Sequence, residues 1–365
     1  MPPWPERFAS TPADRRALLA LSALRSTPAR RLQELALEHR TAARCLRAVT
    51  HERAIPGAEA GRAREADVDA IVAAVRACGA RMIVPSDPEY PPSLEDLADP
   101  PAWLFVRGRK LHELYPRVAM VGARNCSETG RDIANEMGRG LAQAGICVVS
   151  GGALGIDSAS HVGALAAGGP TIAVLGCGID RTYPASNRKL MARIEEAGAV
   201  VSEYPPGVSP DAFRFPARNR IVAALAEAVV VVEGATGSGS LITADHALDL
   251  GRPISAIPGA VTNPLAAVPL ALIRDGATLV RGSEDLLSDL GRIDARPDAD
   301  RVAAGLSVAH QTVLARLTGP TLAEHVARDL QWDLSDVVAA LVDLEIRGLV
   351  RSIGGRFEPR LGASR

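Results

Sequence analysis

Glycine, serine and arginine gather in two neighbouring stretches of the chain in a pattern that suits phosphate binding. In FPARNR, residues 215–220, the cations Arg218 and Arg220 follow a proline at the start of a predicted apolar helix. Cations in the first turn of a helix oppose its dipole, so they cost stability unless an anion lies nearby. In EGATGSGSLITA, residues 233–244, four small residues precede another predicted helix: Gly237, Ser238, Gly239 and Ser240. Amides, hydroxyls and a helix N-terminus together form an anion site.

Two other segments share this character. SGGALGID, residues 150–157, begins with Ser150, Gly151 and Gly152, whose small side chains let backbone amides approach an anion. In VGARN, residues 121–125, Gly122 ends a predicted strand and Arg124 projects just beyond it. Structural alternatives remain open: a tight strand-to-helix turn capped by Asp157, and, for FPARNR, two solvated surface arginines.

These segments must be positioned by a sheet. From Arg117 onward, amphipathic stretches separate short apolar runs: RVAMVGA, ICVVSGG, TIAVLGCG, AVVSEYP, VVVVEG and PISAIPG. Continuous apolar strands that alternate with helices are typical of a parallel sheet covered on both faces, and ligands bind at the carboxyl ends of such strands. We therefore expect an α/β fold with an extended Rossmann-like domain. Four phosphate-friendly segments at one sheet edge exceed what one mononucleotide needs, so an extended polyanion fits better.

Helices are predicted on both sides of the sheet. Apolar residues at three- and four-residue spacing predict short helices near the N-terminus, where ten arginines and six acidic residues in the first sixty positions favour a solvated face over a DNA contact. A Pro-rich passage, residues 84–108, is expected to lie across the neighbouring domain. Three helices and a hairpin at Gly354 and Gly355 suggest a winged helix at the C-terminus. The predicted domains are a helical (SAM-like) domain 1–65, an extended Rossmann-like domain 66–290 with its sheet core from about 115, a linker 291–304 and a winged helix 305–365.

Composition and motif content limit the classes of function that the chain could have. A net charge of −1 over 365 residues gives no bulk attraction to nucleic acid, so individual positions must carry that case. Neither Lys110 nor Lys189 follows a glycine as a P-loop requires, and the strict GxGxxG fingerprint is missing. His161 and His246 lack partners at ligand spacing, so we expect no metal and no cofactor. Scattered cysteines without a CxxC pair, no apolar signal core and no window of membrane-spanning length favour a soluble, cytoplasmic protein.

The motifs VGAR, SGGALGID, YPASN, SEYPPG, FPARNRIVA, GSGSLITA and IPG occur in this order and resemble those of the DNA-processing protein A (DprA, or Smf) family. The similarity extends to YPPSLEDLADPPAWLFVRG and to the terminal winged helix. It implies a homodimeric protein that binds and protects single-stranded DNA during natural transformation of competent cells, and that loads the RecA recombinase for DNA recombination. The missing P-loop lysine and the missing glutamate of related hydrolases predict that it is not an enzyme.

The resemblance also implies a DNA site, which is carried over residue by residue. Its members would be Gly122, Arg124, Ser150, Gly151, Gly152, Arg188, Lys189, Arg214, Arg218, Asn219, Arg220, Gly237, Ser238, Gly239 and Ser240. Two departures from the family pattern stand out. Asp211 and Ala212 replace a basic residue, for which Arg214 is the candidate substitute. Val268 and Leu270 stand where the family usually has Gly-x-Asn, which puts the dimer contact in question.

Two other function classes compete with this interpretation. Related phosphoribohydrolases carry PGGxGTxxE with a catalytic glutamate, but the corresponding position here is Thr243, and Asp245 lies on another helix face. A duplex DNA-binding regulator would use the winged helix. Its third helix is acidic, however, with Asp333, Asp336, Asp343 and Glu345 against Arg347, so we expect it to contact protein or to modulate the dimer. The apolar segment 263–273 predicts either a dimer face or a fully buried helix.

Overall fold

The computed structural model describes residues 4–5, 7–25, 27–51, 54–292, 306–317, 319–346, 349–353 and 355–359. The chain divides into two compact units, residues 1–286 and 287–365. Most of the predicted linker, from residue 293 on, lies outside the described residues, as do Arg347 and Gly354. No helix in the described ranges is long and apolar enough to cross a bilayer.

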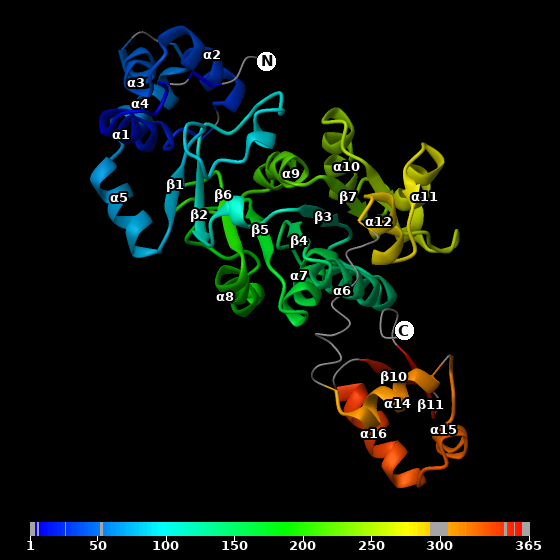
Figure 1. Ribbon diagram of the computed structural model, residues 1–365. Helices are drawn as coiled ribbons and strands as arrows, with labels where there is room; N and C mark the ends of the chain where they lie inside the picture. Colours follow the sequence, from blue (N-terminus) through cyan, green and yellow to red (C-terminus); the bar gives the residue numbers. More distant parts are fainter. Residues whose placement is uncertain are drawn as a thin grey trace. The chain divides into compact units, whose positions relative to one another are not determined.

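The described strands of the first unit form one sheet in the order β1-β2-β6-β5-β4-β3-β7-β8-β9 (Figure 1). Their bounds are β1 Arg81–Ile83, β2 Leu104–Gly108, β3 Arg117–Val121, β4 Cys147–Ser150, β5 Thr171–Leu175, β6 Ala199–Ser202, β7 Ala228–Val231, β8 Ile254–Ala256 and β9 Thr278–Leu279. Neighbours from β6 through to β9 pair in parallel, and β2 pairs antiparallel with both β1 and β6. This confirms the predicted parallel α/β sheet, including all six predicted strands.

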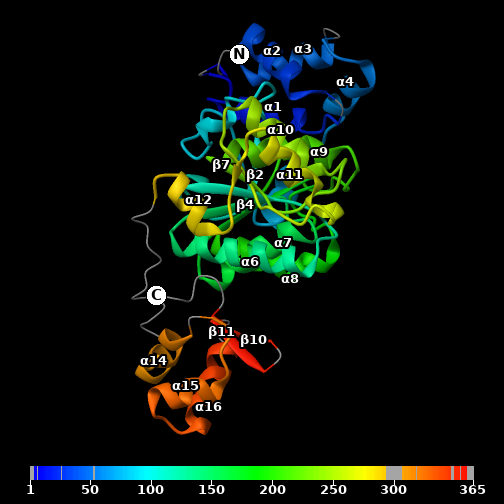
Figure 2. The same ribbon diagram turned by 90° about the vertical axis from the view of Figure 1, so that its right-hand side faces the viewer.

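Helices cover both faces of this sheet, with α6, α7 and α8 on one face and α9, α10 and α11 on the other (Figure 2). Their bounds are α6 Glu128–Gln143, α7 Ile156–Ala166, α8 Arg188–Ala197, α9 Arg214–Leu225, α10 Gly239–Asp249 and α11 Ala267–Arg274, followed by α12 Ser283–Asp289. Side chains of β5 alternate between the faces: Ile172 and Val174 join the cluster with α9, while Ala173 joins the cluster with α8. Two-sided burial explains why these strands are continuously apolar.

The strand order reverses between β3 and β7. From β3 the chain proceeds through β4 and β5 to β6 on one side, and then crosses back so that β7 pairs with the other edge of β3. In open parallel sheets the crevice outside the carboxyl ends of the strands, at such a reversal, is where ligands bind. We call the row of loops that follow β5, β4, β3 and β7 the carboxyl edge: residues 176–184, 151–155, 122–127 and 233–238.

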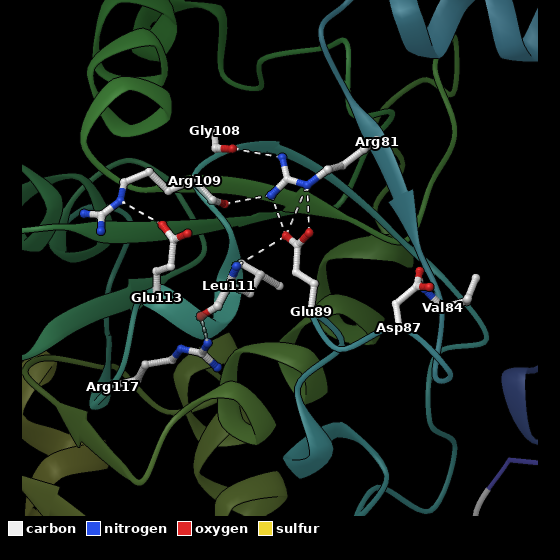
Figure 3. Close-up of polar contacts among 9 residues, drawn as sticks. All are labelled: Arg81, Val84, Asp87, Glu89, Gly108, Arg109, Leu111, Glu113 and Arg117. Carbon is white, nitrogen blue, oxygen red and sulfur yellow. Dashed lines mark hydrogen bonds and ion pairs between the residues drawn. The ribbon is translucent and has the colours of Figure 1, made fainter. Parts of the chain in front are cut away.

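The Pro-rich passage ends in a strand that the sequence did not predict. β2 carries buried residues along most of its length and joins the sheet beside β6. Polar contacts fix this end of the sheet (Figure 3). Arg81 of β1 forms an ion pair with Glu89 and donates to the carbonyl oxygens of Gly108 and Arg109, at 2.9 and 2.8 Å. Glu89 also accepts from the Leu111 amide. The passage is therefore integrated into the sheet.

The N-terminal helices are α1 Pro12–Leu21, α2 Ala29–His39, α3 Ala42–His51, α4 Gly57–Arg64 and α5 Val68–Ala77. Their apolar residues, among them Leu18 and Leu35, share one hydrophobic cluster with Phe105 of β2 and with α8. The helices predicted for this region are confirmed.

The second unit contains α14 Val308–Arg316, α15 Ala323–Leu330, α16 Leu334–Ile346 and the antiparallel pair β10 Val350–Ile353 and β11 Arg356–Pro359. It has a hydrophobic core of its own, which includes Val313, Val326 and Leu341. Three helices followed by a two-stranded wing confirm the predicted winged helix.

Candidate nucleic-acid interface

A cation and two aromatic rings form a platform at the carboxyl edge. The exposed Arg124 follows β3, and its guanidinium carbon lies 5.1 Å from the centre of the Phe215 ring. Tyr183 is 49 % exposed and stacks on Phe215 with ring centres 5.4 Å apart. These three residues line an open hollow of about 350 Å³ together with residues 210–212 and Pro216. Aromatic faces beside a cation are the arrangement on which unpaired bases stack while a phosphate is neutralised.

Sequence reasoning missed Tyr183 and Phe215 as site residues, although both lie in the motifs YPASN and FPARNRIVA. The missed signal was their rarity. The whole chain has 5 phenylalanines and 4 tyrosines, so aromatic residues beside two phosphate-friendly segments were informative. Phe213, also exposed, lies two positions before Phe215.

The Ser150–Gly152 segment packs more tightly than the predicted anion loop. Ser150 is fully buried, and its hydroxyl donates to the Met120 carbonyl oxygen at 2.6 Å, which ties β4 to β3. Gly151 lies against Arg218: a Cβ there would fall 2.3 Å from the guanidinium. Gly152 has φ +67°, and a Cβ there would lie 2.5 Å from Met191. Glycine is therefore favoured at position 152 by its backbone conformation, and a side chain at position 151 would displace the Arg218 guanidinium.

Arg218 lies beneath this loop and is only 5 % exposed. Its guanidinium donates to the carbonyl oxygens of Gly151 and Val174, at the ends of β4 and β5. No carboxylate lies within ion-pair distance of it in the described part of the chain, and burial lowers the pKa of Arg218. Arg218 thus places a positive charge under the carboxyl edge, offset in part by the buried Asp157, with which it interacts electrostatically.

The Asp157 carboxylate accepts a hydrogen bond from one of the loop amides that were predicted to bind an anion. It accepts from the Ala153 amide at 3.2 Å, and burial raises the pKa of its carboxyl group. The tight turn of the structural alternative is present, but Asp157 is not the cap: the N-cap of α7 is Gly155, and no side chain caps the helix. Asn187 connects the same loop to α8 by donating to the Gly152 carbonyl oxygen at 3.0 Å. The exposed cations Arg188 and Lys189 follow directly, at the start of α8.

Helix α9 begins earlier than predicted, at Arg214, because proline is tolerated in the first turn, where amides need no helical partner. Arg218 and Arg220 therefore lie in the second turn, and the cation nearest the helix N-terminus is Arg214, the first residue of α9. Arg220 is buried and paired with Asp99 at 2.9 Å and with Glu203 at 2.8 Å. Two carboxylates already neutralise it, so the structure separates Arg220 from the exposed cations.

Arg214 is also buried. Its guanidinium donates to the Ser209 carbonyl oxygen at 2.6 Å and lies over the rings of Tyr204 and Phe213. It supports the segment before α9 from beneath. The proposed substitute for the missing basic residue therefore lies below the surface.

The GSGS segment forms the N-terminus of α10. Ser238 caps the helix by accepting from the Ser240 amide at 3.4 Å, and the two hydroxyls lie 2.9 Å apart. Gly237 has φ +79°, and both Gly237 and Gly239 are exposed. The Asn219 side chain donates to the Gly239 carbonyl oxygen at 3.1 Å, which ties α9 to this loop. An exposed helix N-terminus thus lies at the β7 end of the carboxyl edge.

The carboxyl edge therefore presents exposed groups above a buried support. Arg124, Arg188, Lys189, Gly237 and Gly239 are exposed; Gly122, Gly151, Asn219 and Ser238 are partly exposed; Ser150, Gly152, Arg214, Arg218, Arg220 and Ser240 are buried. Because β5, β4, β3 and β7 are consecutive in the sheet, their loops form one continuous row. Strand spacing makes this row about 15 Å long.

His161, one of the two histidines considered as metal ligands, lies beside Thr171 at the amino end of β5 and not at the carboxyl edge. His161 on α7 is fully buried and bonds through Nδ1 to the Thr171 hydroxyl at 2.6 Å; burial lowers its pKa to about 3. It is therefore a neutral core histidine. Within the described ranges, no three His, Cys, Asp or Glu side chains are grouped to hold a metal ion.

A parallel Rossmann-like sheet with a cationic and aromatic carboxyl edge, joined to a winged helix, defines a class of nucleic-acid-processing proteins. The family model for DNA recombination-mediator protein A matches residues 81–291, and the model for the DprA winged helix domain matches residues 297–356. The chain belongs to the DprA family.

Relatives in this family are similar over most of the chain. A putative DNA processing protein DprA of Mycobacterium tuberculosis is 38 % identical over 298 residues, covering 76 % of this chain and 77 % of its own. Protein Smf of Escherichia coli is 37 % identical over 286 residues, covering 75 % and 76 %.

Solved structures agree. The X-ray structure of DprA from Streptococcus pneumoniae matches with a TM-score of 0.60 and 38 % identity over 64 % of this chain and 82 % of that chain. DprA from Helicobacter pylori, whose structure describes a single-stranded DNA binding mode, matches with a TM-score of 0.53 and 28 % identity over 58 % and 96 %.

Proposed function

We propose that this chain binds single-stranded DNA along the carboxyl edge, protects DNA that enters during natural transformation, and loads RecA onto it. The observation that carries the proposal is the stacked pair Tyr183 and Phe215 with Arg124 above Phe215. Stacking requires an unpaired base face, which a duplex does not offer. The likeness to H. pylori DprA, whose structure describes a single-stranded DNA binding mode, supports the binding part of this proposal.

The length of the carboxyl edge favours a strand over a single nucleotide. Exposed amides at Gly237 and Gly239 lie at one end, and Arg188 and Lys189 are tied to its middle loops through Asn187. A row about 15 Å long exceeds the reach of one phosphate group. Buried Arg218 adds positive potential beneath it.

Binding of oligonucleotides of graded length tests this proposal. Fluorescence anisotropy with oligo-dT, oligo-dA and a mixed sequence should give affinities that rise with length and then level off, and that differ little between compositions. If a single nucleoside monophosphate binds as tightly as a long oligonucleotide, the extended site is wrong.

The protein should act without catalysis or cofactor. Thr243, at the position of the hydrolase glutamate, is 1 % exposed, and the nearest candidate carboxylate, Asp245, lies on the exposed side of α10. Incubation with nucleoside monophosphates or ATP should release neither ribose 5-phosphate nor phosphate. Release that is lost in Asp245→Asn would favour the phosphoribohydrolase alternative.

The RecA and dimer proposals follow from family membership. RecA filaments should form faster on DNA coated with a single-strand-binding protein when this chain is added.

For the dimer, the late part of the sheet exposes Leu279 on the edge strand β9, and Val261 is 88 % exposed, whereas Val268 of α11 is buried. Light scattering at micromolar concentration should give twice the monomer mass.

A further inference from the structure

Glu233, which closely follows β7, has a buried carboxylate whose two oxygens both accept hydrogen bonds from Ser127. Its Oε1 accepts from the Ser127 hydroxyl at 2.6 Å, and its Oε2 accepts from the Ser127 amide at 2.9 Å. Glu233 is 7 % exposed, and no cation lies within ion-pair distance of it in the described part of the chain. A buried charge without a counter-ion must be stabilised by other donors. Here the donors belong to Ser127, the N-cap of α6.

The carboxylate lies where an open sheet would hold a ligand's phosphate. β3 and β7 flank the reversal of strand order, and α6 begins there with its N-terminus toward Glu233. Such a helix N-terminus attracts anions through its free amides and its dipole. Gly130 in the first turn leaves the room that this requires, because a Cβ there would lie 2.4 Å from the carboxylate. The Glu233 carboxylate therefore occupies the position that a ligand's phosphate would otherwise take.

The loop held by this contact carries Arg124. At its start, Gly122 is enclosed by Ile156 and by the Glu233 carbonyl oxygen: a Cβ would lie 2.6 and 2.9 Å from them. Next to it, the Ala123 carbonyl oxygen accepts from the Ile156 amide at 3.2 Å. At its end, Ser127 is held by Glu233. Arg124 thus lies within a six-residue loop that is fixed at both ends.

We infer that Glu233 is a positioning residue: its carboxylate fixes the 122–127 loop so that Arg124 lies over Phe215 before DNA arrives. This inference rests on the proposed single-strand site. Preorganisation increases affinity because the ordering cost is met before binding. Glu233 cannot itself contact a phosphate, since it is buried and of the same charge.

A double-mutant cycle between Glu233→Gln and Arg124→Ala tests the inference. Glutamine keeps the shape but removes the charge, so two charge-assisted hydrogen bonds are replaced by weaker neutral ones, with the Ser127 hydroxyl now accepting from the glutamine NH₂ group. Glu233→Gln should weaken binding of a 30-nucleotide oligo-dT about five- to tenfold, yet change the affinity of Arg124→Ala less than about twofold, because residues that act through one contact are not additive. Lys189→Ala is the matched control. Lys189 is exposed on α8, so the fold-losses of affinity caused by Lys189→Ala and by Glu233→Gln should multiply in the double variant.

Amide hydrogen exchange separates this inference from the proposed function. In DNA-free protein, residues 122–127 should exchange faster in Glu233→Gln than in wild type, with the sheet strands unchanged. If wild type fails to bind oligo-dT, the proposed function is wrong while the exchange result still decides the positioning role. Unchanged amide exchange in residues 122–127 overturns the inference. So does a double variant of Glu233→Gln and Arg124→Ala whose loss of affinity is the product of the two single losses, as is expected for Glu233→Gln with Lys189→Ala. Should Glu233→Gln not fold, Ser127→Ala takes its place in the cycle; it removes the hydroxyl that donates to Glu233 and, with it, the acceptor that caps α6 at the Gly130 amide.

Discussion

Burial decides which arginines at the carboxyl edge can meet a phosphate. Arg124 is exposed, whereas Arg218 and Arg220 of the FPARNR motif are each 5 % exposed. The motif spacing identified all of them as candidates but could not show their orientation. That orientation depends on the start of α9 and on Asp99 and Glu203, which both lie outside the motif. A motif therefore predicts the residues of a site better than it predicts their individual roles.

Arg220→Ala should reduce stability far more than it alters DNA contacts. It would leave Asp99 and Glu203 without their common cation, and breaking a buried ion pair typically costs roughly 3–5 kcal/mol. Because Asp99 is 43 % exposed, we expect about 3 kcal/mol or slightly less. Denaturant unfolding measures this directly. Arg124→Ala is the matched control, with an expected change within about 0.5 kcal/mol. Equal stability of the two variants would mean that the Arg220 pairs do not form.

At the scale of single elements, the alternation of apolar runs and amphipathic stretches predicted the parallel strands of the sheet but missed strands at its two ends. The six buried parallel strands were predicted because residues buried on both faces leave a continuous apolar run. β2 was missed because prolines precede it and obscure its boundary. β9 was missed for another reason: it has two residues, both exposed, and such a strand leaves no apolar pattern.

The loops after β3 and β5 and the start of α9 form the aromatic platform, so Phe215→Leu should weaken binding of single-stranded DNA. Base–aromatic stacking contributes about 1–3 kcal/mol per base, which corresponds to a loss of roughly five- to 150-fold. Anisotropy with oligo-dT measures the loss. Tyr115→Leu serves as control, because Tyr115 is 63 % exposed but precedes β3 at the opposite end of the strands. Equal losses in both variants would contradict a localised platform.

The winged helix should be dispensable for single-strand binding. On α16, Asp336 and Glu345 are exposed, and Asp343 pairs with His310 at 2.9 Å. Acidic side chains repel a phosphate backbone, whereas the third helix of a DNA-reading winged helix normally supplies cations. A chain ending at Ala303 should keep its oligo-dT affinity within about twofold. A folded truncation that no longer binds would show that the site extends beyond the sheet.

For the whole molecule, a net charge of −1 means that the proposed attraction to DNA has to arise locally. The cations of the carboxyl edge are few, and Asp211 lies among the residues that line the same hollow. Stacking must therefore carry a substantial share of the affinity. This predicts a salt dependence limited to a few phosphates and a strong preference for unpaired strands.

The most direct measurement of the central claim compares single-stranded and duplex DNA of the same 30-nucleotide sequence at two salt concentrations. Single-stranded DNA should bind at least about tenfold more tightly, because only its base faces are free to stack. Its affinity should fall with salt at a log–log slope of about −0.7 per phosphate contacted. Arg124→Ala should lower that slope by about one such contact. Equal affinity for the two forms of DNA, at both salt concentrations, would contradict the account.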